Sequence, residues 1–226
     1  MSYKLARPEK RFLCPGPHPN GLQAADDGLW CIDQANNKLY RLDYDTGEVL
    51  FEVQTDTVAS SGITLGGGYL WIASTYESKI CQLDPATGKT IARYESPGAG
   101  VVAWREGAAD AQSTGAHGLE WRDDKLYVAS PPSQMIHVID PSNWQELWRF
   151  RAPGLRVHGL AWGEQGRLWV ADTSAGTISL LDTDSGRVYQ VLRLEAPTEV
   201  HGMTIRDGVL WYCDAETREI GRLLVE

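Results

Sequence analysis

Short apolar runs, each closed by a polar residue and separated from the next by glycine-containing turns, recur along the whole chain. One run appears five times as a leucine, an aromatic residue, two further residues and a final Asp or Ser, at 29–33, 70–74, 126–130, 168–172 and 210–214. No window of useful length keeps the 3.6-residue period of an amphipathic helix. Short runs bounded by turn residues predict β-strands, and hence an all-β fold.

The five runs mark a structural repeat. Their aromatic residues stand 41, 56, 42 and 42 positions apart. In the clearest repeat, a first strand at 158–162 precedes the aromatic run, and strands at 177–182 and 188–194 follow it. Four short strands that recur with this period are typical of a β-propeller blade.

The two ends of the chain complete the pattern. The last repeat stops after its third strand, at 219–225, and a strand at about 10–14 belongs to no repeat. Pairing these segments would close the ring and remove two exposed strand edges. The sequence therefore predicts one domain over residues 1–226, a single five-bladed β-propeller of four-stranded blades, in which the N-terminal strand completes the last blade.

Composition narrows the range of partners. There is no run of about 18 apolar residues to span a membrane, and the first residues lack the apolar core of a signal peptide, so we expect a cytoplasmic protein. The net charge is −9 without a basic cluster, which argues against nucleic acid as a partner. The four cysteines lack CxxC spacing and are expected to be reduced, apolar strand residues.

One position of the repeat carries most of the candidate chemistry: the residue directly before the glycine of each first strand. It reads Asn20, Ser61, His117, His158 and His201, so three of the chain's five histidines occupy it. The first strand of a propeller blade is innermost, so these side chains are expected to converge near the axis. Neutral imidazoles suit zinc and other first-row metals, and three protein ligands leave an open position for water or substrate.

We therefore predict His117, His158 and His201 as ligands of one divalent transition metal, zinc first, with manganese, iron or nickel next. Asn20 and Ser61 are predicted to bind substrate. A second interpretation stays open, in which all five residues are hydrogen-bonding plugs in a water-filled channel.

The whole-chain pattern resembles the propellers of the NHL-repeat, gluconolactonase-like and virginiamycin-B-lyase-like families, which implies the fold more than the chemistry. The segments Ala-His-Gly-Leu at 116–119, Val-His-Gly-Leu at 157–160 and Val-His-Gly-Met at 200–203 are also similar to the zinc-holding motifs of peptidyl-hydroxyglycine alpha-amidating lyases. That resemblance implies the same three histidines as ligands. The chain has five repeats rather than six and lacks that family's catalytic Tyr and Arg motifs, so peptide amidation is not implied. It also shows none of the motifs of bacterial glutaminyl cyclases, which are five-bladed propellers too.

The 56-residue step contains an insertion at about 98–113 that leads directly into His117. It is expected to project from the face that carries the histidines, as a lid or binding surface. Trp104 is predicted to bind substrate, and Arg105 to hold a carboxylate or a developing oxyanion. A mobile surface loop or an oligomer contact is the alternative.

Two further candidates complete the predicted catalytic set with Arg105. Glu120 is the carboxylate at a repeat position where the other blades have uncharged residues, and it suits a general base or a partner of an imidazole, or equally a solvated strand residue. Tyr76 lies in a loop after the second strand and is not repeated.

These features favour a metal-dependent lyase, with a hydrolase next, acting on a small polar molecule at the mouth of the channel. The metal would stabilise an oxyanion or activate water. The alternative is a non-catalytic propeller that presents the same face to a peptide or protein, marked by an exposed apolar patch around Trp104. The substrate and the oligomeric state are not identified by the sequence.

Overall fold

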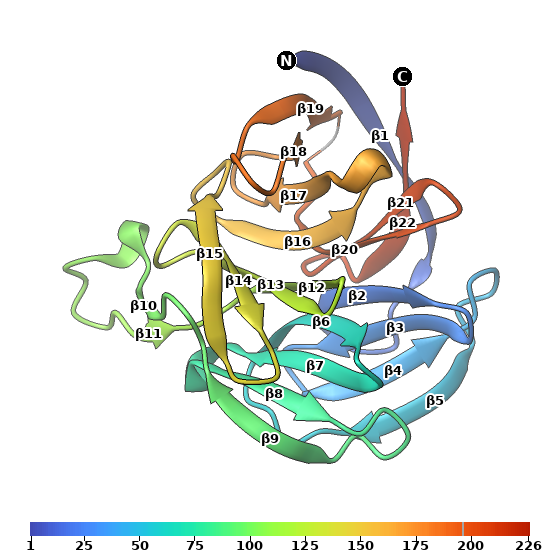
Figure 1. Ribbon diagram of the computed structural model, residues 1–226. Helices are drawn as coiled ribbons and strands as arrows, with labels where there is room; N and C mark the ends of the chain where they lie inside the picture. Colours follow the sequence, from blue (N-terminus) through green and yellow to red (C-terminus); the bar gives the residue numbers. More distant parts are fainter. Residues whose placement is uncertain (196) are drawn as a thin grey trace.

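The computed structural model describes residues 1–195 and 197–226, and strands make up most of it (Figure 1). The helical segments of the described residues are three short 3₁₀ turns, η1 (Thr75–Glu77), η2 (Ala103–Arg105) and η3 (Glu164–Gly166). None of the helices found in this part of the chain is long and apolar enough to cross a membrane. The predicted all-β class is confirmed.

Three four-stranded antiparallel sheets follow the repeat. The first has the order β2 (Pro19–Ala25), β3 (Gly28–Asp33), β4 (Lys38–Leu42), β5 (Val49–Gln54). The second has the order β6 (Ser60–Gly66), β7 (Tyr69–Ser74), β8 (Lys79–Leu83), β9 (Thr90–Glu95). The third has the order β12 (Gly118–Arg122), β13 (Lys125–Ser130), β14 (Met135–Asp140), β15 (Gln145–Arg151).

The remaining strands form one eight-stranded sheet. Half of it is β16 (Val157–Trp162), β17 (Leu168–Asp172), β18 (Thr177–Leu181) and β19 (Val188–Leu194). The other half is β20 (Val200–Arg206), β21 (Val209–Asp214), β22 (Glu219–Val225) and β1 (Ser2–Leu13). The N-terminal strand pairs antiparallel with β22, as expected, but it begins at Ser2 rather than at residue 10. Its first residues also pair in parallel with β19, which joins the two halves.

The first strands of the repeats surround a common axis. Strands β2, β6, β12, β16 and β20 contact one another in a closed ring, and the sheets radiate from it (Figure 1). The apolar core lies between neighbouring sheets, as where the buried Trp71 of β7 packs with Leu119 and Trp121 of β12. Its indole donates to the Gly66 carbonyl at 3.1 Å. This is the layout of a β-propeller.

Glycines let the inner strands approach closely and so close the channel. A Cβ on Gly118 would lie 1.8 Å from the His158 carbonyl oxygen, and one on Gly62 would lie 2.5 Å from the Leu119 nitrogen. The space enclosed at this level is about 10 Å³, which is room for no more than about one water molecule. The mouth above the glycines is therefore separated from the far end of the channel.

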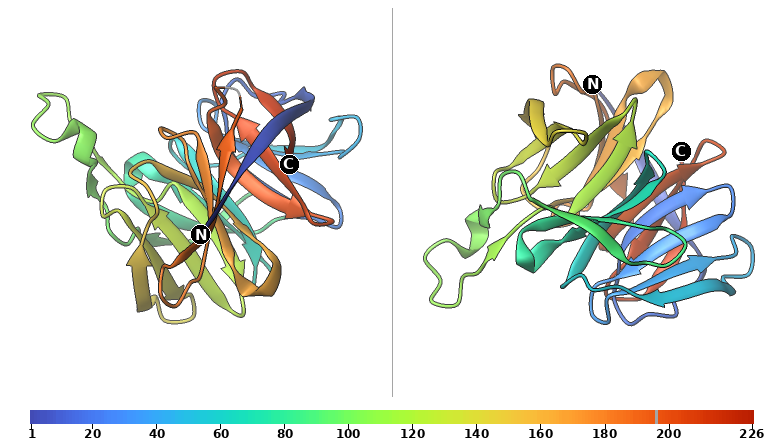
Figure 2. Two further views of the ribbon diagram at one scale, coloured as in Figure 1. Left: turned by 90° about the horizontal axis from the view of Figure 1, so that it is seen from above. Right: turned by 60° about the horizontal axis from the view of Figure 1, so that its bottom comes forward.

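The insertion forms a small projecting hairpin. Strand β10 (Gly100–Val101) pairs antiparallel with β11 (Ser113–Thr114), and η2 lies in the tip between them. The green segment of Figure 2 extends away from the body of the propeller in both views. Because β11 ends three residues before His117, the base of the hairpin stands beside the histidines, as the sequence predicts.

Candidate functional site

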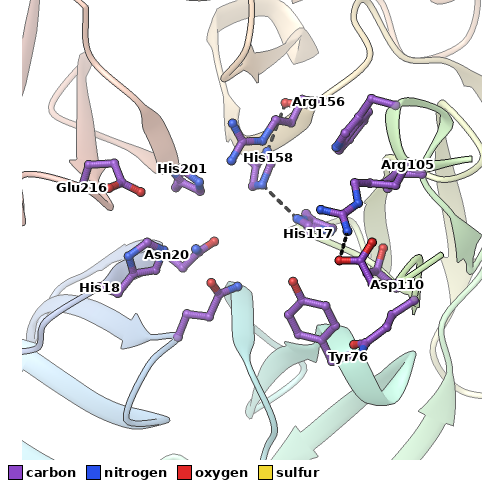
Figure 3. A pocket seen from close by; sticks show the side chains of 15 residues that line it. His18, Asn20, Tyr76, Arg105, Asp110, His117, Arg156, His158, His201 and Glu216 are labelled. Atoms are coloured by element: carbon purple, nitrogen blue, oxygen red, sulfur yellow. Dashed lines mark hydrogen bonds and ion pairs between the residues drawn. The ribbon is translucent and has the colours of Figure 1, made fainter. Parts of the chain in front are cut away.

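Three imidazoles stand side by side at the mouth of the channel (Figure 3). The ring centroids of His117 and His158 are 4.5 Å apart, and those of His158 and His201 are 4.6 Å apart. The pairing registers of β16 and β20 shift where His158 and His201 lie, and such a bulge re-aims a side chain, here toward the axis. The structure thus brings together the three histidines that one repeat position predicts.

Backbone carbonyls determine which ring nitrogens carry protons. His158 Nδ1 lies 3.0 Å from the Arg156 carbonyl oxygen, and His201 Nδ1 lies 2.9 Å from that of Glu199. A carbonyl accepts only, so both Nδ1 atoms carry the proton and both Nε2 atoms keep a lone pair. The Thr173 hydroxyl supports this arrangement, since it donates to the Val200 carbonyl at 2.9 Å and lies 3.1 Å from His158 Nδ1.

His117 is oriented differently from its two neighbours. Its Nδ1 lies 2.9 Å from His158 Nε2, and because that atom has a lone pair, His117 Nδ1 must be the donor. His117 Nε2 is then unprotonated, and it is buried with no hydrogen-bond partner among the described residues. An orphaned acceptor of this kind at a cavity wall indicates a position that a ligand group completes.

All three imidazoles are neutral at physiological pH. Burial lowers the pKa of His117 to about 3 and that of His201 to about 4. Burial also lowers the pKa of His158 well below its usual value, with help from its two imidazole neighbours. The cluster therefore offers nitrogen lone pairs, which can accept a proton or bind a metal, and carries no charge of its own.

The imidazoles form part of the wall of a cavity of about 440 Å³. The hairpin supplies another wall through Trp104, Arg105 and Asp110. The Trp104 side chain is 47% exposed, and the Arg105 guanidinium pairs with the Asp110 carboxylate at 2.6 Å. Tyr76 of η1 also lines the cavity and is 53% exposed (Figure 3). The candidates Trp104, Arg105 and Tyr76 thus lie at the same mouth as the histidines.

Asn20 and Ser61 occupy different depths, although they share one repeat position. Asn20 lines the cavity. Ser61 is fully buried and is not part of the cavity wall. Its hydroxyl lies 2.7 Å from Asn20 Oδ1 and 2.9 Å from the His117 carbonyl oxygen. Ser61 therefore ties Asn20 to the strand that carries His117 and is placed to orient the amide.

Glu120 is not brought to the histidines. It lies three residues farther along β12, past the ring of glycines, and does not line the mouth cavity. Burial raises the pKa of its carboxyl to about 8, and its Oε1 accepts from the Trp121 N–H at 3.2 Å and lies 3.5 Å from Thr64 Oγ1. A protonated carboxyl at this depth is separated from any molecule held at the mouth.

The rim contains residues that the sequence analysis does not assign. Arg156 and His18 stand two positions before His158 and Asn20, and both line the cavity. The ring of His18 is 6.0 Å from that of His201, centroid to centroid. Thr114 and Glu216 line it too. The sequence does contain a signal for these rim residues. The repeat position two residues before the histidine position carries charged or imidazole side chains in three of its five copies.

The imidazole cluster has donor atoms of the type that bind a metal, but their present arrangement does not form a metal site. Neutral imidazole nitrogens are the donors that zinc and related ions prefer. However, no group of three His, Cys, Asp or Glu side chains in the described ranges is arranged to hold a metal ion. The hydrogen bond from His117 to His158 occupies the lone pair that a metal would need.

Comparisons with known proteins agree on the fold. A sequence profile of the anaphase-promoting complex subunit 4 WD40 domain matches residues 133–207, about a third of the chain. No curated protein sequence shows a significant match.

Among solved structures, the glutaminyl cyclase of Myxococcus xanthus is similar with a TM-score of 0.79 at 10% identity, over 100% of this chain and 98% of that one. A streptogramin B lyase is similar with a TM-score of 0.59 at 17% identity, over 97% of each chain. A catalytically inactive virginiamycin B lyase of Staphylococcus aureus with quinupristin is similar with a TM-score of 0.57 at 22% identity, over 91% of this chain and 65% of that one. The chain is a β-propeller of the kind found in virginiamycin B lyase and glutaminyl cyclase.

Proposed function

We propose that the chain is a five-bladed propeller enzyme that works at the mouth of its channel. The eight-stranded sheet divides naturally into two blades, because β1 completes one and touches the other only through its parallel pairing with β19. Together with the three separate sheets, this division supports a count of five blades. The whole-length similarity to two propeller enzymes supports a catalytic function.

We propose elimination from a small polar molecule as the reaction, with hydrolysis as the next choice. The observation that carries this is the unprotonated Nε2 of His201 beside the cavity, fixed by its Nδ1–H bond to the Glu199 carbonyl. In the elimination, this nitrogen takes a proton from a carbon of the substrate. The C–H electron pair forms the new double bond, and the leaving group departs with its own pair. In a hydrolysis, the same nitrogen takes the proton from water.

Other cavity residues have supporting roles in this proposal. We assign the Tyr76 hydroxyl to protonate the leaving group, and Arg105 to stabilise negative charge that develops on the substrate, because both residues line the cavity. Trp104 covers the bound molecule, and Asn20 orients it. The histidine-to-alanine change in the inactive virginiamycin B lyase supports a catalytic imidazole in a propeller of this kind.

A divalent transition metal, zinc first, is the alternative to His201 acting as a base, because the one Nε2 lone pair of His201 cannot both bind a metal and take a proton. His117, His158 and His201 would hold it, and it would supply Lewis-acid stabilisation of an oxyanion. The His117–His158 hydrogen bond must break for this to happen. Metal analysis of protein purified without chelator, compared with His117→Ala/His158→Ala, tests it: about one equivalent in the wild type and none in the folded variant supports the cofactor.

The enzymatic proposal is tested with a panel of small polar acids, esters and lactones, by following the product double bond or the released acid. Wild-type protein is compared with His201→Asn, and with His137→Asn as a control histidine outside the cavity. We expect turnover that His201→Asn lowers by at least about 100-fold and that His137→Asn preserves. Equal turnover in all three proteins would contradict the proposal.

One observation favours the second candidate, a non-catalytic propeller that binds a peptide or protein. Exposed side chains of Trp104 and Tyr76 stand around the cavity, and exposed apolar patches mark interaction surfaces. A Trp104→Ala variant that loses capture of a peptide, while no compound of the panel is turned over, would favour this function.

A further inference from the structure

We propose that Arg156 is the anion-binding residue of the mouth cavity, and that the ligand it takes is a small molecule with one carboxylate. This inference rests on the proposed function and names the substrate class of the same site. Arg156 directly precedes β16, and its guanidinium lies over the imidazoles of His158 and His201 in Figure 3.

The backbone of Arg156 is fixed by the site itself. Its carbonyl accepts the Nδ1–H of His158 at 3.0 Å and the N–H of Thr173 at 3.1 Å. Its charge reaches the whole cluster, since it adds to burial in lowering the pKa of His117, His158 and His201. The side chain is therefore anchored at its base and held within reach of all three rings.

The charge of Arg156 is less compensated than that of Arg105, the other arginine of the cavity. The nearest carboxylate oxygen to its guanidinium belongs to Glu199, at 3.8 Å, which is too long for a direct hydrogen bond. Arg105 pairs with Asp110 at 2.6 Å on the exposed hairpin. An incoming anion would have to displace Asp110 from Arg105, whereas Arg156 can receive one directly.

The imidazoles determine how the rest of the ligand lies. His201 Nε2 presents a lone pair, which repels an anion and attracts a hydrogen-bearing group. The carboxylate is therefore directed to Arg156 and the proton-donating part to His201. Thr114 adds a further contact: it is 7% exposed, lines the cavity, and its hydroxyl has no partner among the described residues.

The charge balance of the cavity favours one carboxylate over a doubly charged group. Asp110 and Glu216 also line it, so a dianion would meet two carboxylates and only one readily available guanidinium. A planar carboxylate matches the two parallel N–H donors of that guanidinium. This is why the proposal names a carboxylate rather than a phosphate.

Calorimetric binding of 3-phenylpropanoate and of its neutral amide, 3-phenylpropanamide, tests the proposal without requiring turnover. We expect wild type to bind the carboxylate at least about tenfold more tightly than the amide, a difference of about 1.4 kcal/mol. Arg156→Gln should remove this preference, and Arg156→Lys should keep part of it as a point charge. Arg149→Gln, an exposed arginine outside the cavity, is the control and should leave it unchanged.

Three results would overturn the inference: no measurable carboxylate binding to wild type, equal affinity for carboxylate and amide, or an equal loss in Arg149→Gln and Arg156→Gln. Melting temperatures confirm that each variant is folded. Carboxylate binding through Arg156 without any turnover would leave the inference standing while the enzymatic proposal fails. Turnover of a panel compound by a protein that binds carboxylate and amide equally would overturn the inference and leave the enzymatic proposal standing.

Discussion

His117 Nδ1 lies 2.9 Å from His158 Nε2, so one imidazole of the cluster donates directly to the next. The direction of this bond follows from the Arg156 carbonyl, which requires the proton of His158 to be on Nδ1. Two lone pairs result, on His117 Nε2 and His201 Nε2, and neither has a hydrogen-bond partner among the described residues. The cluster can therefore accept a hydrogen bond or a proton without changing its tautomers.

Thr173 is predicted to hold the cluster in this protonation pattern. Its buried hydroxyl connects His158 Nδ1 to the Val200 carbonyl. Thr173→Val leaves that carbonyl without its donor, so we expect a loss of about 1–2 kcal/mol in the free energy of unfolding, measured by urea denaturation. Thr46→Val, in an exposed turn, is the control and should cost less. An unchanged stability of Thr173→Val would contradict this role.

Gly118 is predicted to be irreplaceable because its Cα faces the neighbouring inner strand. In Gly118→Ala the new Cβ would lie 1.8 Å from the backbone oxygen of His158, and a backbone cannot move aside as a flexible side chain can. We expect a loss of about 3 kcal/mol or more. Gly100→Ala, whose Cβ meets nothing nearer than 3.7 Å, is the control. Similar stabilities of the two variants by thermal denaturation would show that the inner strands are not closely packed.

Glu120 is predicted to make the protein less stable as pH rises. Burial raises its pKa from 4.5 to about 8 in the folded state, so between these values the folded protein keeps a proton that the unfolded chain has lost. The folded state then binds more protons, and the free energy of unfolding falls with pH at up to about 1.4 kcal/mol per pH unit. Above pH 8 this dependence ends.

The variant Glu120→Gln isolates this contribution. The amide does not titrate, so the decline between pH 5 and 8 should be smaller than in the wild type, and the variant should be the more stable protein at pH 9. Denaturation at several pH values checks both points. Parallel curves for the two proteins would mean that Glu120 is ionised when folded.

The N-terminal strand is predicted to keep the propeller closed. Removing residues 1–9 takes away most of the pairing of β1 with β19 and β22, which amounts to several backbone hydrogen bonds of about 1 kcal/mol each, and leaves two open edges. We expect a lower melting temperature and aggregation. Replacing 103–111, the tip of the hairpin, with a short glycine linker should change the melting temperature little. If the truncation lowered the melting temperature less than the hairpin replacement did, strand β1 would not be what closes the ring.

The repeat made most of the fold predictable, because strands of the same sequence at a regular spacing leave few arrangements. It also predicted that His117, His158 and His201 would meet. It did not predict depth along the axis. Glu120 and His117 are three residues apart, and the close glycine contacts between them place Glu120 past the constriction and His117 at the mouth. Arg156 was missed because only the histidine position of the repeat was considered, although the position two residues before it also carries charged or imidazole side chains in three of its five copies.

The central claim, that three neutral imidazoles hold unprotonated Nε2 atoms at the mouth, is tested most directly by nitrogen-15 NMR of the histidine side chains at neutral pH. The account predicts the Nδ1–H form for His117, His158 and His201, with His158 Nε2 shifted by the hydrogen bond it accepts. Protonated Nε2 atoms on His158 or His201, or a charged ring anywhere in the cluster, would contradict it.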